Sequence, residues 1–171
     1  MQKKNIISII SIINLVLIMI LGPSVRAANT ATVNATVTVQ KVSVSVAPGT
    51  VAYGILPLNT STSTCDLSPV GTQTVTNDGN VAETFNIMGS NSTNWTLGAS
   101  PGNEIYVHKF SSSTCSVNWT GAPALTTNYQ TLATNVSASS TIPLNLQVTT
   151  PTSTSFYTQQ SFSVTVQAIA Y

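Results

Sequence analysis

This chain of 171 residues carries very little charge. Charged side chains make up 5% of it, whereas soluble domains carry about 25%. After residue 27 the charged residues are Lys41, Lys109, Asp66, Asp78, Glu83 and Glu104. Such a chain has no basic patch, so we predict no nucleic-acid partner. Serine and threonine are abundant instead, and their hydroxyls keep a surface hydrated without ionising.

Residue types that catalyse reactions or bind metals are also scarce. The chain has one histidine, His108, and two cysteines, Cys65 and Cys115. A zinc site needs three or four nitrogen, sulfur or carboxylate ligands. Nucleophilic catalysis needs a nucleophile, a base and an orienting group, and the chain offers one histidine and four scattered carboxylates. We therefore predict that the protein is not an enzyme and has no catalytic residues, cofactor or metal site.

Cysteine is limited to Cys65 and Cys115, and C-x-x-C redox spacing is absent. An even cysteine count in an exported chain is typical of a disulfide. Within one chain, this bond would close a loop of about 50 residues. In the chain-entropy model it would stabilise the fold by about 3–4 kcal/mol.

Residues 1–27 have the pattern of an export signal. Lys3 and Lys4 precede the apolar run "NIISIISIINLVLIMILG", and Val25 and Ala27 stand at the −3 and −1 positions of a cleavage site. We predict cleavage after Ala27, a secreted product and no stable membrane span afterwards. The alternative is an uncleaved membrane anchor, because the apolar run is long enough to cross a bilayer.

Six Asn-X-Ser/Thr sequons follow, and in an exported chain they predict covalent N-glycans. They begin at Asn34, Asn59, Asn91, Asn94, Asn118 and Asn135. Asn34 stands among residues that alternate with valine and alanine. A glycan there would point away from whatever those apolar residues bury.

Short alternating runs separated by turn residues fill the rest of the chain, and none has the periodicity of a helix. The runs at 72–76 and 81–87 flank "NDGN", which predicts a hairpin. Pro143, on the polar side of the run at 141–148, predicts an edge strand. Further strands are predicted at 42–46, 51–55, 95–97, 104–110, 115–119 and 162–171. Eight to ten strands at this spacing predict an all-β protein, an antiparallel Ig-like or pilin-like β-sandwich over residues 42–171.

The stretch "ATVNATVTVQKVSVSV" at 31–46 changes phase in the middle. Its apolar residues are first Ala31, Val33, Ala35, Val37 and Val39, and after Gln40–Lys41 they are Val42, Val44 and Val46. A slip of one residue sends every side chain of a strand to the opposite face. The segment is therefore either an ordinary first strand with a bulge, or a strand that packs elsewhere than its successor.

A strand that packs elsewhere is explained if the sandwich lacks one strand. An extension of the next subunit would then fill the groove by strand addition. Residues 30–39 would span about 34 Å when extended, which is the length of a sandwich. The odd-numbered residues would enter the groove, and residues 28–41 would form the donor strand and its hinge. Such a head-to-tail contact does not close, so it builds a filament of identical subunits.

The chain resembles the archaeal thread pilins. The resemblance lies in the signal followed at once by "ATVNATVTV", in "VTNDGNVAETFNI", in the two cysteines and the sequons, and in the C-terminal "VTVQAIAY". Camelysin-like fibre proteins and archaeal bundling pilins are more distant in architecture. The resemblance implies a glycosylated, secreted filament on the cell surface, with residues 30–39 as donor strand. The alternative function is a monomeric secreted or cell-surface Ig-like adhesive module.

Some pilin-like sandwiches also carry lysine–asparagine isopeptide crosslinks, made with the help of a carboxylic acid. Lys41 and Lys109 are the lysines available for such a bond, and Glu83 and Glu104 are the acids. The sequence leaves open whether one forms.

Overall fold

The computed structural model describes residues 29–171, so the predicted signal at 1–27 lies outside the described residues. The chain divides into one unit that ends at Thr38 and a second from Val39 to Tyr171. In the first unit, residues 29–38 form no strand, and the side chains of Val33 and Val37 are 90% and 91% exposed. Within the described residues, no helix has the length and apolar character needed to cross a membrane.

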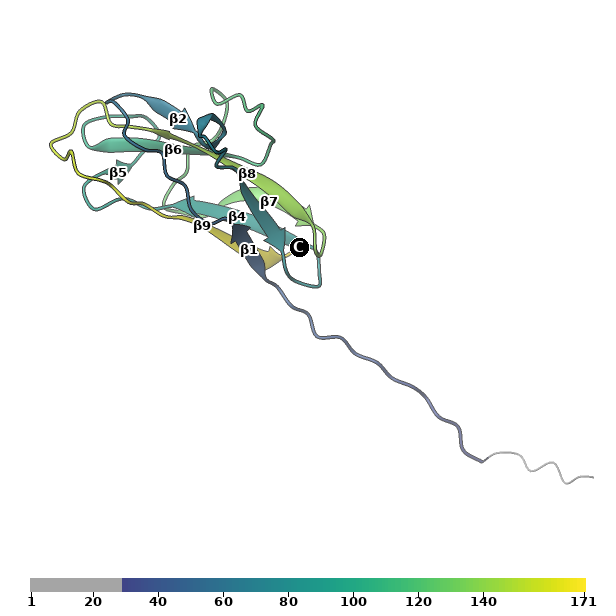
Figure 1. Cartoon of the computed structure of the whole chain (residues 1–171). Helices are drawn as coiled ribbons and strands as arrows, with labels where there is room; N and C mark the ends of the chain where they lie inside the picture. Colours follow the sequence, from purple (N-terminus) through teal and green to yellow (C-terminus); the bar gives the residue numbers. More distant parts are fainter. Residues whose placement is uncertain (1–28) are drawn as a thin grey trace, which may run out of the picture. The chain divides into compact units, whose positions relative to one another are not determined.

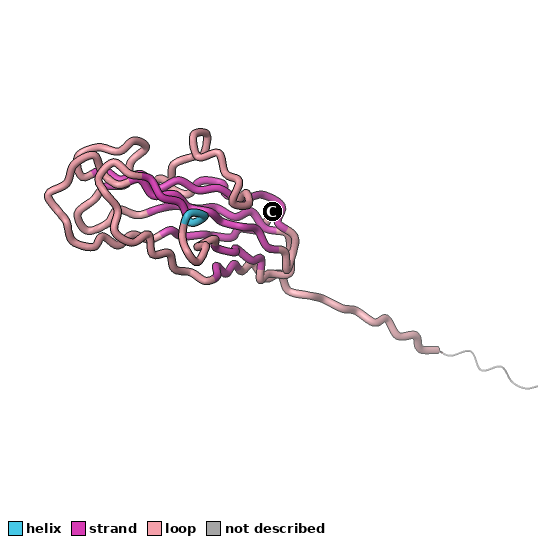
Figure 2. The backbone as a smooth tube through the Cα atoms, turned by 45° about the horizontal axis from the view of Figure 1, so that its top comes forward, coloured by secondary structure: helices cyan, strands magenta, loops and turns pink. Residues whose placement is uncertain are grey.

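The second unit is an all-β sandwich of two sheets, with a single 3-10 turn as its helical element (Figures 1 and 2). The larger sheet has the strand order β1-β3-β8-β6-β5, and β2 also pairs with β8. Its pairs are antiparallel except β5 with β6. Its strands are β1 (Val44–Ala47), β2 (Ser61–Ser63), β3 (Gln73–Asn77), β5 (Thr96–Leu97), β6 (Ile105–Ser111) and β8 (Thr141–Thr149).

The smaller sheet has the order β7-β4-β9, and both of its pairs are antiparallel. Its strands are β4 (Glu83–Gly89), β7 (Gln130–Val136) and β9 (Val164–Ala170). The central strand β4 alternates strictly between buried and half-buried residues. Its inward residues Phe85 and Ile87 meet Val75, Leu144 and Leu146 of the other sheet in one apolar core. The predicted β-sandwich class is therefore confirmed.

The expected hairpin across "NDGN" is wrong. β3 and β4 belong to different sheets, so this turn is a corner that carries the chain from one sheet to the other. The buried side chain of Asn77 holds the corner. Its amide nitrogen donates to the Val81 and Val136 carbonyls at 2.9 and 2.8 Å, and its oxygen accepts from the Gly79 N–H. A turn sequence specifies a reversal of the chain, but not which strand becomes the partner.

Three further strand predictions need correction. β8 is a central strand between β3 and β6, although Pro143 suggested an edge. Residues 115–119 are a loop, and residues 51–55 form no strand, although Val51 and Tyr53 pack against the core. β8 also buries Leu144, Asn145 and Leu146 in succession, because segments of the chain cover both of its faces.

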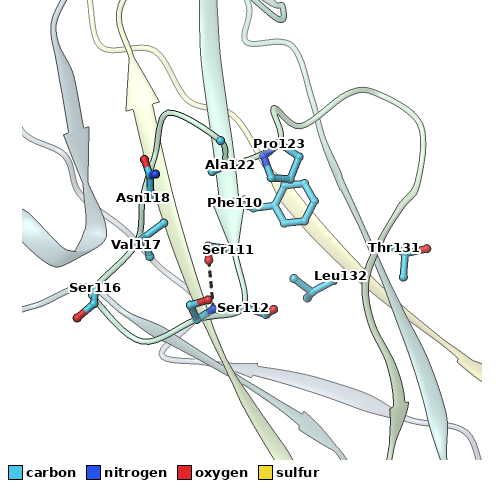
Figure 3. A pocket seen from close by; sticks show the side chains of 12 residues that line it. Phe110, Ser111, Ser112, Ser116, Val117, Asn118, Ala122, Pro123, Thr131 and Leu132 are labelled. Atoms are coloured by element: carbon cyan, nitrogen blue, oxygen red, sulfur yellow. Dashed lines mark hydrogen bonds between the residues drawn. The ribbon is translucent and has the colours of Figure 1, made fainter.

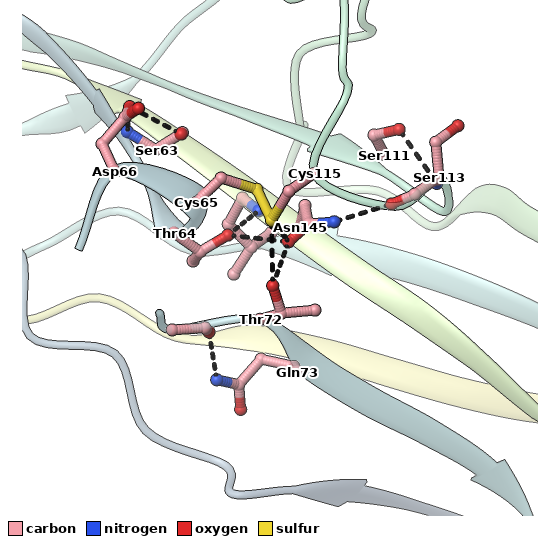
Figure 4. The surroundings of a disulfide bond; sticks show 12 residues. Ser63, Thr64, Cys65, Asp66, Thr72, Gln73, Ser111, Ser113, Cys115 and Asn145 are labelled. Atoms are coloured by element: carbon pink, nitrogen blue, oxygen red, sulfur yellow. Dashed lines mark hydrogen bonds between the residues drawn. A yellow bond between two sulfur atoms is a disulfide. The ribbon is translucent and has the colours of Figure 1, made fainter. Parts of the chain in front are cut away.

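The predicted disulfide joins Cys65 to Cys115, with 5.5 Å between the two Cα atoms (Figure 4). It ties the 3-10 turn Thr64–Asp66 to the loop after β6. The fully buried Asn145 lies beneath the bond. Its oxygen accepts from the hydroxyls of Thr64 and Thr72 at 3.1 and 2.7 Å, and its amide nitrogen donates to the Ser113 carbonyl at 2.6 Å. The disulfide and Asn145 thus fix the two loops that cover the outer face of β8.

Candidate functional site: the open seam between β1 and β9

A sandwich has two seams, one along each margin where the two sheets meet. At the β6–β7 seam the chain fills the gap with its own residues 123–126. The Phe110 N–H donates to the Pro123 carbonyl at 3.2 Å, and the Leu125 N–H donates to the His108 carbonyl at 2.7 Å. The Gly89 N–H of the other sheet donates to the Thr126 carbonyl at 2.9 Å. The side chain of Leu125 is 1% exposed and belongs to the core, so this seam is closed.

A hollow of about 360 Å³ remains at the surface of this closed seam (Figure 3). Its lining mixes serine, threonine and asparagine side chains with Phe110, Val117, Pro123 and Leu132. Phe110 and Leu132 are 5% and 8% exposed, so little apolar surface faces the hollow. The backbone of β6 is already paired with residues 123–125 here. This hollow therefore offers no strand edge to a partner.

The β1–β9 seam is different, because each of its walls ends in an unpaired strand edge. Among the described residues β1 pairs only with β3, and β9 pairs only with β4. β1 and β9 lie on the same margin of the sandwich (Figure 1). β9 is seven residues long and carries no charge, no proline and no bulge against β4. Long, regular, uncharged edges of this kind attract other strands.

An apolar groove of about 280 Å³ runs along this open seam. Val46, Val51 and Tyr53 line one wall, and Phe162, Val164 and Val166 line the other; Leu144, Leu146 and His108 also contribute. Residues 162, 164, 166 and 168 face the core but are only half-buried, in contrast to their partners Phe85 and Ile87, which are fully buried. The inward face of β9 is thus incompletely covered.

A ring cluster forms the end of the groove near Phe162. The Phe162 ring stacks on Tyr106 with 4.6 Å between centroids and meets His108 edge-on at 5.2 Å. The Tyr53 hydroxyl lies 3.0 Å from Nε2 of His108, whereas Nδ1 of His108 has no partner. Burial lowers the pKa of His108 to about 3 and raises the pKa of Tyr53. His108 is therefore a neutral part of the wall rather than an acid–base group at neutral pH.

The other end of the groove is tied shut by two adjacent residues. The Glu83 carboxylate oxygen Oε1 accepts from the Ser43 N–H at 2.8 Å, just before β1 begins. The Ala82 carbonyl accepts from the Tyr171 N–H at 3.0 Å, just after β9 ends. β1 and β9 therefore converge at Ala82–Glu83, and a strand laid along β9 must stop there.

Glu83 itself is unusual, because it is fully buried and its second oxygen, Oε2, has no hydrogen-bond partner among residues 29–171. It lies on the inward face of β4, opposite Ala170 of β9. A Cβ atom on Gly79 would collide with the Glu83 carboxylate and with the Lys41 carbonyl, so glycine is needed at this position. An unpartnered buried carboxylate oxygen is costly to leave unsatisfied and marks a place where a donor is missing.

The turn after β3 also binds residues 39–43, which connect the N-terminal segment to the sandwich and are called its root here. The side chain of Asn80 accepts from the Lys41 N–H at 2.7 Å and donates to the Val39 carbonyl at 2.9 Å. The Asp78 N–H donates to the Ser43 carbonyl, and the Lys41 ammonium group donates to the Asp78 carbonyl at 2.9 Å. Residues 39–43 are thus fixed to the sandwich, and the predicted hinge at Gln40–Lys41 falls within this root.

The predicted donor residues are apolar side chains that lie exposed in the described structure. Ala31, Val33, Ala35, Val37 and Val39 are all exposed. The alternation at 31–39 predicts a strand, yet these residues form none in the structure. The residues that form the acceptor groove cannot be identified from the sequence, because the two walls of the groove come from segments more than 100 residues apart. Only the folded structure shows that the inward-facing residues of 162–168 are half-exposed.

Five of the six sequon asparagines are exposed, and Asn94 is half-buried. The side-chain oxygens of Asn91 and Asn118 accept from the N–H groups of Leu97 and Thr120 at 2.9 and 3.1 Å. These contacts leave the amide nitrogen, the atom to which an N-glycan would be attached, free of that bond. Asn135 lies on the outer strand β7 with a φ of 53°, in a stretch where pairing with β4 shifts register.

The other two charged candidates, Lys109 and Glu104, form hydrogen bonds with different partners. The Lys109 ammonium group donates to the Trp119 carbonyl at 2.7 Å, and Glu104 accepts from the Ser155 N–H at 2.6 Å. Within residues 29–171, no group of three or more histidine, cysteine or carboxylate side chains could hold a metal ion.

Comparisons with protein-family models, with curated proteins and with solved structures find no match for this chain.

Proposed function

We propose that this protein is the structural subunit of an extracellular, pilus-like filament, in which the N-terminal segment of one subunit fills the open seam of the next. The proposal rests above all on one observation, the unpaired β9 edge beside a half-exposed apolar groove. In a single chain this edge is exposed to chance pairing with other strands. Residues 31–37 supply apolar side chains in strand alternation and have no partner of their own.

The energetics favour this pairing. Each valine of the segment that becomes buried contributes about 1.5–2 kcal/mol. Each hydrogen bond gained along the β9 edge adds about 0.5–1.5 kcal/mol. The contact links the edge of one subunit to the segment of another, so it repeats without closing and produces a filament. Identical subunits and covalent N-glycans are the proposed partners, and attachment to surfaces or biofilm formation is the proposed role on the cell surface.

The test compares two matched substitutions in filaments isolated from the native source. Val37→Asp places a charge in the groove and is expected to abolish filaments, because an unpaired buried charge costs several kcal/mol. Thr36→Asp lies on the opposite face and is expected to leave filaments nearly unchanged. Negative-stain images of the sheared cell-surface fraction, scored for filament number and length, distinguish these outcomes.

Equal effects of the two substitutions would show that the assigned face is wrong. A chain that lacks residues 28–40 and still forms normal filaments would exclude strand donation altogether. A cell-surface fraction that contains only monomers would favour the adhesive module instead.

A further inference from the structure

The groove has two unequal ends, and this asymmetry determines how a strand can lie in it. At the Phe162 end no hydrogen bond joins residues 46–53 to residues 162–166 within the described part of the chain, and aromatic rings line the groove. At the Ala170 end Ala82 and Glu83 tie the walls together. The subunit's own N-terminal segment also leaves the sandwich at this tied end, because Asn80 holds Val39 and Lys41 there.

We infer that the inserted segment runs antiparallel to β9, with Val37 beside Phe162 and Asn29 beside Ala170, where the Asn29 amide donates to the unpartnered oxygen of Glu83. This inference rests on the proposed function and adds the direction and register of the strand. The tied end of the acceptor already carries the acceptor's own N-terminal segment. In a growing filament the sandwich of the donor subunit must therefore lie beyond the other end of the groove, the Phe162 end, which we call the open end. The part of the donor nearest its own sandwich therefore lies at the open end, and its tip lies at the tied end.

The register follows from matching the two inward faces in steps of two residues. β9 and its approach offer four half-buried inward residues, and the donor offers four apolar residues before its carbonyl at Val39 is held by Asn80. The resulting pairs are Val37–Phe162, Ala35–Val164, Val33–Val166 and Ala31–Ala168. The next step brings Asn29 opposite Ala170, which is itself opposite Glu83 on β4. Asn29, Ala170 and Glu83 thus form one inward row across three strands.

This row joins two polar groups that are otherwise unexplained. Glu83 is buried, with Oε2 unpartnered. Asn29 is the one polar residue on the odd-numbered face of the segment 29–39. The small side chain of Ala170 between them leaves room for the asparagine amide to reach the carboxylate. A hydrogen bond to a charged acceptor is stronger than one between neutral groups. It would also satisfy the oxygen that the isolated sandwich leaves without a donor.

The opposite direction has a different consequence. A strand parallel to β9, with its apolar face in the groove, would place Ala31 near Phe162 and Val37 near Ala168, and the donor's own sandwich would lie at the tied end. Two subunits would then exchange segments reciprocally, or one chain would fold its segment back into its own groove. Neither arrangement propagates, so the direction of the strand separates a filament from a closed dimer or a self-complemented monomer.

Disulfide trapping between two different subunits tests the direction. Two versions of the full chain are produced together in the native host, one with Val37→Cys and the other with Phe162→Cys. Directly opposed residues of antiparallel strands have Cα atoms about 4.5–5.5 Å apart, which a disulfide spans. We expect a covalent heterodimer on non-reducing gels, with the two substituted peptides linked in mass spectra. The matched pair Val37→Cys with Ala168→Cys is expected to give none.

Trapping of Val37 to Ala168 would overturn the inferred direction. Filaments that form but trap neither pair would overturn the register, while the proposed function would stand. An absence of filaments from the unsubstituted chain would remove the proposed function and this inference together.

A charge exchange tests the Asn29–Glu83 contact. Asn29→Asp would set two carboxylates against each other and is expected to lower the filament yield by about tenfold. Glu83→Gln added to the same chain restores a donor–acceptor pair, because the glutamine amide can donate to Asp at position 29 and its oxygen can still accept from Ser43. Recovery of filaments in the double variant is expected. An Asn29→Asp chain that forms filaments like the original would contradict the contact, and so would a double variant no better than the single one.

Discussion

At the β6–β7 seam the chain covers its own core with residues 123–126, whereas at the β1–β9 seam it leaves Val46, Val164 and Val166 half-exposed. The outer edges differ in the same sense. β7 shifts register against β4, which hinders pairing with a further strand, and it carries a sequon at Asn135, where a glycan would have the same effect. β9 is regular and uncharged. The chain therefore covers the β6–β7 margin with its own residues, whereas the β1–β9 margin has the properties of an edge to which another strand can be added.

The largest expected difference between the seams appears when each is given a charge. Leu125→Asp is expected to lower the free energy of unfolding of the monomer by about 4 kcal/mol or more, because Leu125 belongs to the core. Val37→Asp is expected to change it by less than about 0.5 kcal/mol, because Val37 is exposed in the single chain. Urea denaturation of both monomers measures the contrast, and equal losses would contradict it.

The disulfide stabilises the closed seam from the loop that precedes it. Replacement of Cys65 and Cys115 by serine is expected to lower the free energy of unfolding by about 3–4 kcal/mol. Amide exchange at residues 123–125 should accelerate more than at residues 44–47, because Cys115 lies in the loop that leads to this seam. Equal acceleration at both sites would show that the bond supports the whole sandwich rather than one margin.

Acid should act on the open seam through His108. Burial lowers its pKa in the folded protein to about 3, whereas the unfolded chain has the usual value of about 6.5. Below pH 6.5 the unfolded chain therefore binds a proton that the folded chain excludes, and stability falls as the pH decreases towards 3. Between pH 6.5 and 5 the free energy of unfolding is expected to fall by about 1.5 kcal/mol.

The lowered pKa of Asp66, held by hydrogen bonds from Ser63, acts in the same direction only at lower pH. His108→Phe should remove the slope between pH 6.5 and 5. The same slope in this variant would show that another group causes it.

The smallest effect is expected at the protected edge. Ser137→Ala removes the sequon at Asn135 of β7 without replacing the asparagine at its positive φ, and it should change the free energy of unfolding by less than about 0.5 kcal/mol, because Ser137 is exposed. If glycans shield this edge, filaments of the variant should associate side by side more often in negative-stain images. An intact mass equal to that of the bare polypeptide from the native source would show that no sequon is occupied.

Local alternation predicted the sandwich and much of its strand content, since each strand keeps an inward face over several residues. β9 begins two residues after the predicted alternating run at 162, and β6 differs from its prediction by one residue at each end. Pairing was less predictable. "NDGN" indicates a turn but not that its strands belong to different sheets. Pro143 lies in a central strand, but in the part of β8 that pairs with β3 alone, because pairing with β6 begins only at Asn145.

For the same reason, only the donor half of the site could be predicted from the sequence. The donor residues are consecutive in the sequence, so their alternation is visible there. The acceptor groove is built from residues 46–53, 108, 144–146 and 162–166, which only the fold brings together. Nothing in the sequence marked Glu83 as a groove residue either, because its role depends on Ser43 and Ala170 being its neighbours in the fold.

Hydrogen exchange of the β9 backbone in filaments and in dissociated monomers tests the central claim most directly. The amides of β9 that point away from β4 have no partner strand in the single chain, so they should exchange rapidly in monomers and slowly in filaments. The outer amides of β7 serve as the internal control and should exchange alike in both forms. Filaments whose β9 amides exchange as rapidly as those of the monomer would contradict strand addition at the open seam.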